Sequence, residues 1–485
     1  MTAPERATES AASGAFIRKH GRNLIVSLYG AMRAMKLYPV EHNAVQKTLA
    51  ELTETAQEIL KHESELEIRI AGEFIFLNSN RMRLDLTNFA SFGHVQSLCK
   101  AAGIGSISLN QPGSARDWMV FLAQLDSQTK AAPSDRFDEI CRKLSEAGVT
   151  AFQLEPPSES ESDKQLAEET RAAAQRTYAT SVALTRDVMN SVRMGRTPSI
   201  KKIKRVVQGI VDQILNEETS LINLTAIRDY DEYTFTHSVN VCIFAVSLGR
   251  RLGLTKIQLY DLGLAALMHD IGKSRVPVDF LQKEGGLTEA EWRGIAAHPW
   301  LGVLALFQFR REQEQLSYRA MTVAYEHHMK CDLSGYPKPV RPRSLSMTSK
   351  IVAVADGYDA ATSRRAYQTV PYPPPAVLQE MRDNPRRGMD QTVVKAFINL
   401  LGIYPTGTLV VLDTFELAVV HAANPSPEML SRPVVKLVSD ANGLMLNPPP
   451  LVDLSIPEAN GEYARTIIKT ADPERYGINL NDYIV

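Results

Sequence analysis

Five of the ten histidines in this 485-residue chain lie between positions 237 and 328. Successive members of the series are about thirty residues apart, roughly one helix plus its loop. The series consists of His237, His269, His298, the pair His327-His328 and, at the same interval, Asp356. Successive helices of a bundle can each deliver one such side chain to a shared interior point. The spacing therefore predicts a helical bundle with a polar cluster inside it.

The chain is too long for one compact core, so several domains are expected. The stretch "EPPSESESDKQ" at 155–165 is rich in Pro, Ser and acidic residues and reads as a linker. It separates an α+β module at 1–153 from the remainder. A linker and connecting helix at 154–199 lead to an all-helical domain at 200–401, and a small β-rich module occupies 402–485. The predicted fold class is mainly α.

Local patterns specify the elements at the two ends of the chain. In the first module, helices are predicted at 16–36, 44–61, 88–102 and 115–126 from apolar residues at helical spacing. The alternation that ends in Ile70, followed by Phe74 and Phe76, predicts a hairpin. In the last module, the runs 407–422 and 432–446 are β-rich, and the second contains Asn442-Gly443, a pair that two-residue hairpin turns favour.

Composition excludes several classes of protein. Apolar residues make up 44% of the chain and charged residues 22%, as in ordinary globular proteins. The net charge of -1 argues against a protein that coats DNA or RNA. The first residues contain no apolar signal core, and no later run approaches the ~20 apolar residues of a membrane span. Four cysteines without paired spacing predict neither disulfides nor a zinc knuckle. We expect a cytoplasmic protein.

The stretch "LMHDIGKSRVP" at 267–277 places an imidazole, a carboxylate and an ammonium in an apolar context. Burying each charge alone would be costly, so the set needs a partner. A structural ion pair, an acid/base pair and a metal ion with a bound anion are the alternatives. His237 alone would read as a core histidine, but the series as a whole favours divalent metal ligands, with Asp270 bridging two ions. Two such ions can activate water and orient a phosphodiester.

Three further side chains suit an anionic substrate. Lys273, one turn beyond Asp270, could face a phosphate oxygen, although a lysine at a helix end commonly reaches solvent. Tyr336 lies on the tight loop of "HHMKCDLSGYPKP", where it could bond to a phosphate, stack on a base or be a plain turn residue. In "KIVAVADGYDAATSRRAY", Asp356 and Asp359 are one helical turn apart, and Arg365 would suit a second phosphate.

Taken together, "HDIGK", "HP", "HH", "SGYP" and "VADGYDAATSRRAY" resemble the HD-GYP domain, a subgroup of the HD-domain phosphohydrolases, over about 200–401. The resemblance implies an all-helical core with a two- or three-metal centre, commonly iron or manganese. It also implies hydrolysis of the bacterial second messenger cyclic di-GMP to the linear dinucleotide pGpG or to GMP. Some members of the family act on cyclic GMP-AMP instead.

The resemblance carries over residue by residue. The positions that match the family's metal ligands are His237, His269, Asp270, His298, His327, His328 and Asp356. Those that match its phosphate and ligand contacts are Lys273, Tyr336 and Arg365, and Asp270 and Lys273 are the expected catalytic residues. Two divalent ions are expected, iron or manganese first, with zinc, nickel or magnesium as alternatives.

The chain departs from the family pattern at several places. Members with a third metal have a Glu where this chain has Tyr233, and Glu232 lies about 100° off that helical face. Two metals are therefore expected. Met329 and Leu333 replace the usual Glu and Gly of the loop, and Gln368 replaces a Lys near the second phosphate. These changes bear on substrate affinity rather than on metal binding.

Two other functions use the same residues. A scaffold could bind the dinucleotide and signal through partners with the N-terminal module, which we expect to serve regulation, interaction or homodimerisation. A mononucleotide phosphohydrolase could use the same metals. We assign no function to His42, His62, His94 and His421, the first three of which read as surface or capping residues.

Overall fold

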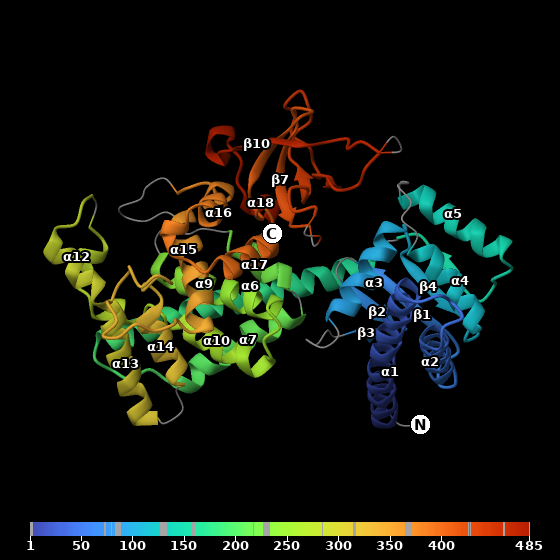
Figure 1. Cartoon of the computed structure of the whole chain (residues 1–485), viewed down its shortest axis with the longest axis horizontal. Helices are drawn as coiled ribbons and strands as arrows, with labels where there is room; N and C mark the ends of the chain where they lie inside the picture. The colour runs from blue at the N-terminus through green and yellow to red at the C-terminus, as the bar shows by residue number, and fades with distance from the viewer. Residues whose placement is uncertain are drawn as a thin grey trace. The chain divides into compact units, whose positions relative to one another are not determined.

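The computed structural model describes residues 3–484 apart from thirteen short stretches, namely 72–73, 79, 83–88, 127–132, 158–160, 217, 227–232, 284, 314–316, 364–370, 425, 427 and 459–460. The described chain forms two compact units (Figure 1), one of residues 1–168 with 456–462 and one of residues 169–455 with 463–485. Among the helices described, none is both long and apolar enough to cross a membrane. The prediction of a mainly helical protein is confirmed.

The first unit combines helices with a five-stranded antiparallel sheet of order β3-β2-β1-β4-β5. Its helices are α1 (Ala3–Leu37), α2 (Asn43–Leu60), α3 (Phe89–Ala101), α4 (Ala115–Leu125) and α5 (Pro133–Glu146). Its strands are β1 (Leu66–Ala71), β2 (Phe74–Leu77), β3 (Asn80–Arg81), β4 (Ser106–Leu109) and β5 (Gln153–Glu155). The predicted hairpin is confirmed by pairing of Ile70 with Ile75. His42 Nδ1 accepts a hydrogen bond from Ala44 N at the start of α2, so it is a capping residue.

The helices of the second unit pack around α9, whose residues 237–250 are all buried. A helix that is buried on every side has no polar face, and α9 fits this rule with its run "VNVCIFAVSLG". It packs against α10, α15 and α17. The helices of this unit are α6 (Glu161–Arg193, which begins in the first unit), α7 (Ile200–Asn216), α8 (Glu218–Leu224), α9 (Tyr233–Arg251), α10 (Lys256–Leu267), η1 (Ile271–Arg275), α11 (Val278–Leu281), α12 (Glu289–Ala296), α13 (His298–Gln313), α14 (Tyr318–Glu326), α15 (Met347–Thr362), α16 (Pro374–Asp383), η2 (Pro385–Arg387) and α17 (Gln391–Leu401).

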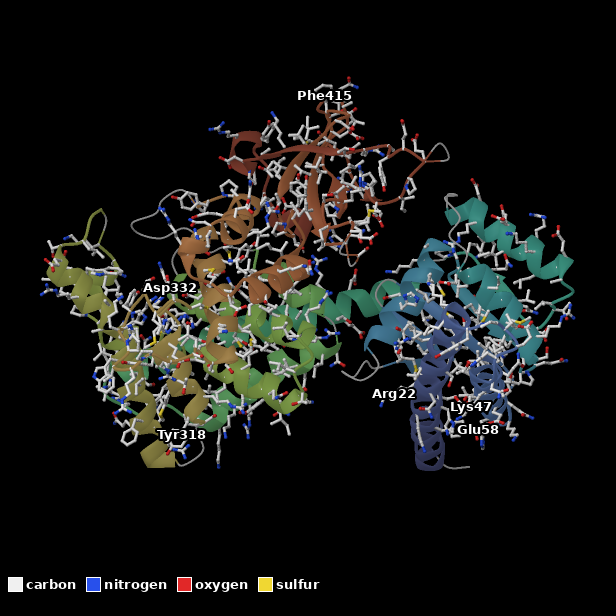
Figure 2. The ribbon with its side chains drawn as sticks, viewed as in Figure 1. Arg22, Lys47, Glu58, Tyr318, Asp332 and Phe415 are labelled. Carbon is white, nitrogen blue, oxygen red and sulfur yellow. The ribbon has the colours of Figure 1, made fainter. Side chains whose placement is uncertain are left out.

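The C-terminal strands form a second antiparallel sheet of order β10-β6-β7-β8-β9, within the same compact unit as the helices. The elements are β6 (Leu409–Leu412), β7 (Leu417–Ala422), β8 (Val434–Leu437), β9 (Leu451–Asp453), β10 (Ile467–Ala471), η3 (Pro473–Tyr476) and α18 (Asn481–Ile484). The predicted turn at Asn442-Gly443 is confirmed, although the residues after it form an isolated bridge instead of a strand. Ser439 and Met445 form the bridge, Asp440 N donates to Leu444 O and Leu446 N donates to Val438 O, both at 2.9 Å. The strand neighbour of β8 is β9. Phe415, in the β6–β7 turn, projects into solvent (Figure 2).

Candidate metal centre

Five helical segments of the second unit bring the predicted ligands together. His237 lies on α9, His269 and Asp270 follow the end of α10, and His298 begins α13. The remaining three are His327 and His328, which follow α14, and Asp356 on α15. One nitrogen or oxygen atom from each residue belongs to one of two groups, and the atoms of each group lie within 4.8 Å of one another. The groups are Asp270 with His298, His327 and His328, and His237 with His269 and Asp356. The structure thus collects all seven residues at one place.

Asp270 lies between the two groups, and each of its carboxylate oxygens faces one of them. Oδ1 is 3.2 Å from His298 Nε2 and 3.7 Å from His327 Nε2. Oδ2 is 3.3 Å from His269 Nε2 and 3.6 Å from His237 Nε2. A carboxylate that presents its two oxygens in this way can bridge two cations.

Backbone carbonyls orient three of the imidazoles. Nδ1 of His269 lies 2.7 Å from Ala266 O, and Nδ1 of His298 lies 2.8 Å from Ile295 O. Nδ1 of His327 lies 3.0 Å from Ala324 O. A carbonyl only accepts, so each Nδ1 carries the proton and each Nε2 presents its lone pair to the centre. The backbone therefore selects the tautomer that binds a metal through Nε2.

A chain of side-chain hydrogen bonds orients His237 instead. Its Nδ1 donates to Asp359 Oδ2 at 2.8 Å. Asn240 Nδ2 donates to Asp359 Oδ1 at 3.0 Å, and Tyr178 on α6 donates to Asn240 Oδ1 at 2.9 Å. A carboxylate behind a ligand histidine fixes its ring and raises its basicity. The sequence pattern placed Asp359 one turn after Asp356 but did not show which ligand it would support, because His237 is far away in the chain.

Two glycines allow the backbone to close around the centre. A Cβ at Gly272, in the "HDIGK" motif, would lie 1.9 Å from His298 O. One at Gly335, in "SGYP", would lie 2.0 Å from His328 O. No side chain fits at such distances, so each glycine lets its loop pack directly against a histidine-bearing segment.

Charges at the centre favour a cation. Burial acts against ionisation of Asp270, but Lys273 and His269 hold its carboxyl pKa well below the usual range. Burial likewise opposes the charge on Asp356, yet His237 and His328 keep its pKa well below the usual range. Burial lowers the imidazole pKa of His298 and His328. The result is ionised carboxylates beside neutral imidazoles, which is the protonation state of metal ligands.

His237 responds differently because it lies between two carboxylates. Burial acts to lower its pKa, but hydrogen bonds with Asp356 and Asp359 prevail and raise it to about 9. Its Nε2 is 3.1 Å from Asp356 Oδ1. The negative charge of Asp356 and Asp359 therefore favours either a proton on His237 or a cation bound beside it.

The residues fit a pair of divalent ions. His269 Nε2 is buried and has no hydrogen-bond partner in the described part of the chain. A buried polar atom without a partner is costly, and a coordinated ion would satisfy it. The donor set of imidazole nitrogen and carboxylate oxygen suits borderline divalent metals.

The structure also locates most of the predicted substrate contacts. Lys273 Nζ donates to Asp270 Oδ2 at 2.5 Å and its side chain is partly exposed, so it lies at the centre. The Tyr336 ring lies 4.8 Å from the His328 ring. Arg365 and Gln368 lie outside the described residues, as does Glu232.

Met329 and Leu333, the two residues that depart from the family pattern in this loop, both lie in a tight turn of the backbone. Met329 is fully buried, and its carbonyl accepts from Gly335 N at 2.9 Å. Leu333 has φ of 60°, the left-handed region that glycine adopts more easily. Leu333 therefore adopts a backbone conformation that costs it more free energy than it would cost a glycine.

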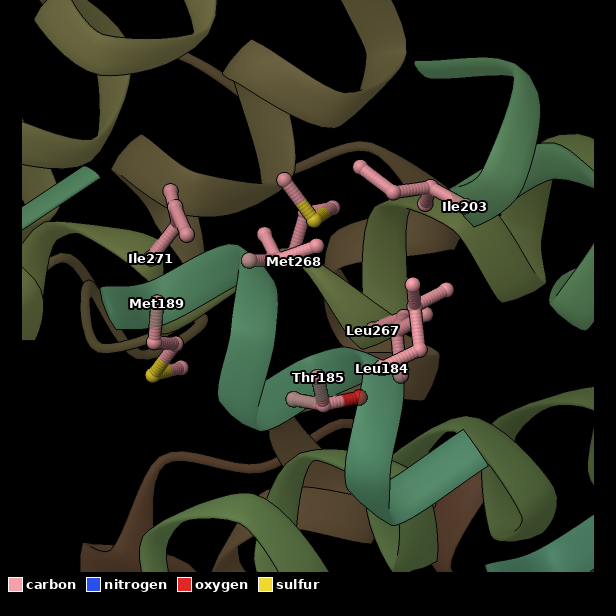
Figure 3. Close-up of a pocket in the computed structure, with 8 residues that line it drawn as sticks. Leu184, Thr185, Met189, Ile203, Leu267, Met268 and Ile271 are labelled. Atoms are coloured by element: carbon pink, nitrogen blue, oxygen red, sulfur yellow. The ribbon is translucent and has the colours of Figure 1, made fainter. Parts of the chain in front are cut away.

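An apolar pocket lies behind the "HDIGK" motif, among α6, α7 and the end of α10 (Figure 3). Its lining includes Met189, Ile203, Met268 and Ile271. Its polar member, Thr185, donates its hydroxyl to Ser181 O on its own helix. The pocket offers no free polar group and is separate from the histidine cluster, so we regard it as a packing gap.

Comparisons with known proteins agree with the motifs. The HD domain family model matches residues 211–393. The cyclic di-GMP phosphodiesterase PA4108 of Pseudomonas aeruginosa is 34% identical over 292 residues, which are 60% of this chain and 68% of that protein. The 3'3'-cGAMP-specific phosphodiesterase 3 of Vibrio cholerae is 31% identical over 174 residues, 36% of each chain. Among solved structures, Bd1817, an HDG"Y"P protein from Bdellovibrio bacteriovorus, matches with a TM-score of 0.39 and 14% identity over 54% of this chain and 86% of its own.

Proposed function

The chain belongs to the HD-GYP family of HD-domain phosphohydrolases, and from this premise we propose that it hydrolyses cyclic di-GMP in bacterial second-messenger signalling. The class of enzyme, a cyclic dinucleotide phosphodiesterase, follows from its relatives. Cyclic di-GMP is our choice of substrate because PA4108 shares the longer matching segment. The products would be pGpG, GMP or both.

The observation that carries the proposal is the position of Asp270, with one oxygen toward each group of ligands. Two divalent ions bound there would supply Lewis acidity to the phosphodiester and to an attacking water. Asp270 would hold them at a fixed separation, and the imidazoles of His269, His298 and His327 are already oriented toward them.

Lys273 would assist at the same place. In this structure its ammonium contacts Asp270 Oδ2. A phosphate oxygen beside the ions would offer it a second acceptor, and charge-assisted hydrogen bonds to phosphate are among the strong ones. Lys273 would then hold the phosphodiester against the ions and stabilise negative charge in the transition state.

One assay tests the proposal. The protein is reconstituted with Fe(II) or with Mn(II), its metal content is measured, and its products from cyclic di-GMP are resolved by chromatography. We expect pGpG or GMP, and no product from the Asp270→Ala variant. A metallated sample that leaves cyclic di-GMP intact would contradict the proposal.

Two other activities are outcomes of the same assay. Faster turnover of 3'3'-cGAMP would place the substrate specificity with that of the Vibrio cholerae relative. Tight binding of cyclic di-GMP without turnover would indicate the scaffold function, which the altered loop at Met329 and Leu333 favours. Faster turnover of AMP would indicate a mononucleotide phosphohydrolase.

A further inference from the structure

A line of aromatic rings leads from the metal centre to the protein surface. The ring of His328, a predicted ligand, lies 4.8 Å from that of Tyr336. The Tyr336 ring in turn lies 5.5 Å from that of Trp292, with an interplanar angle of 76°. Trp292 is 46% exposed. The line thus ends in an indole that is open to solvent beside the centre.

Exposure alone does not indicate a functional role for Trp292, because single exposed apolar residues are common on proteins. The chain has three tryptophans, of which Trp118 is fully buried and Trp300 is 53% exposed. Trp300 lies on α13 and contacts the ring of Tyr325, at 6.4 Å. Trp292 differs from Trp300 because its aromatic partner, Tyr336, also contacts the histidine cluster.

Local contacts order the helix that carries Trp292, α12, although it buries none of its residues. Thr288 and Glu291 form a capping box at the start of α12, and Lys283 Nζ donates to Glu291 Oε2 at 2.7 Å. Gly294 lies against the ring of Phe280 on α11, where even a Cβ would be only 3.0 Å away. An ordered backbone reduces the freedom that its side chains lose when they bind a ligand.

We propose that the indole of Trp292 stacks on one purine base of the cyclic dinucleotide whose phosphodiester lies at the metal centre. The proposal rests on the proposed function for the identity of the ligand. In a cyclic dinucleotide each phosphate joins two nucleosides, so it has bases as neighbours, and every base has a face that an aromatic ring can stack on. Trp292 would therefore select nucleotide phosphodiesters through their bases, beside the chemistry that Asp270 and Lys273 perform on the phosphate.

The first test compares Trp292→Ala with Trp300→Ala in the metal-loaded full chain. Stacking contributes about 1–3 kcal/mol per base, so Trp292→Ala should raise KM for cyclic di-GMP by roughly five- to 150-fold while kcat and metal content change little. Trp292→Phe should recover most of the affinity, because it keeps an aromatic face. An unchanged KM in Trp292→Ala, or an equal rise in Trp300→Ala, would overturn the proposal.

The second test needs no turnover. Trp300→Phe leaves Trp292 as the exposed tryptophan, and Trp292→Phe leaves Trp300. Added cyclic di-GMP should quench the fluorescence of Trp300→Phe and leave that of Trp292→Phe nearly unchanged. Quenching without hydrolysis would overturn the proposed activity but support the stacking. Hydrolysis with equal quenching in both variants would overturn the stacking alone.

Discussion

His237 Nδ1 and Asp359 Oδ2 lie 2.8 Å apart, although 122 residues separate them in the chain. Both side chains are 1% exposed. The second oxygen of Asp359 accepts from Asn240, which also receives the hydroxyl of Tyr178. Each oxygen of Asp359 therefore has a donor, and Asp359 orients the His237 ring.

We expect Asp359→Asn to weaken metal binding by about 10- to 100-fold, because an amide supports the imidazole less strongly than a carboxylate does. Metal titration followed by elemental analysis measures the effect without any substrate. Asp383→Asn is a matched control, since Asp383 lies on the surface at the end of α16 and pairs with Arg382. Equal metal affinity in the two variants would refute a positioning role for Asp359.

Asp270→Asn should reduce the bound metal by more than the loss of a terminal ligand would. A carboxylate with one oxygen toward each group can hold both ions, and an amide offers only one oxygen. We expect activity to be abolished and metal content to fall at both positions. Asp332→Asn is the control, because this exposed carboxylate accepts from Ser334 N within the loop. A variant that retains two ions per chain would contradict a bridging role.

Lys273→Met should separate substrate binding from metal binding. The ammonium contacts a predicted ligand but is not one, so metal content should remain near that of the wild type. Loss of a charge-assisted contact to phosphate should lower kcat/KM for cyclic di-GMP by roughly ten- to a hundredfold, corresponding to about 1.5–3 kcal/mol. Lys202→Met, at an exposed position on α7, is the control. Wild-type kcat/KM in Lys273→Met would exclude the phosphate contact.

The C-terminal sheet should make stability depend on pH through His421. Burial lowers its imidazole pKa to about 4, and the nearby Lys436 and Arg171 act in the same direction. Because the unfolded state binds the proton more tightly, stability is fully present above about pH 6.5 and is lost as the pH falls toward 4. The loss at low pH should be roughly 1–3 kcal/mol.

His421→Asn removes this titration, so its melting temperature should fall less steeply than that of the wild type between pH 7 and pH 4. The difference should be a few degrees for a chain of this size. Calorimetry at several pH values, with both proteins in the same metal-free buffers, measures it. If the melting temperatures of the two proteins fell equally between pH 7 and pH 4, the folded state would bind a proton at His421 as readily as the unfolded state does.

Much of the organisation was predictable from local sequence. Helical spacing is a local property, so α1, α2, α7 and the hairpin of β1 and β2 follow from patterns within each segment. The turn at Asn442-Gly443 was also predictable. The neighbour of β8 was not, because a strand pairs with whichever edge the tertiary structure presents, and β8 meets β9. The preference of Asn-Gly for a turn does not determine which strand becomes the neighbour of β8.

The sequence by itself determined which residue types are available for the centre and that successive helices carry them, because both are written in the order of the chain. Only the tertiary structure decided that Asp270 turns one oxygen toward each group, that carbonyls leave Nε2 of three histidines facing inward, and that Asp359 supports His237. It also decided that Trp292, and not Trp300, contacts Tyr336. Such relations depend on distances between segments far apart in the chain, which no local pattern encodes.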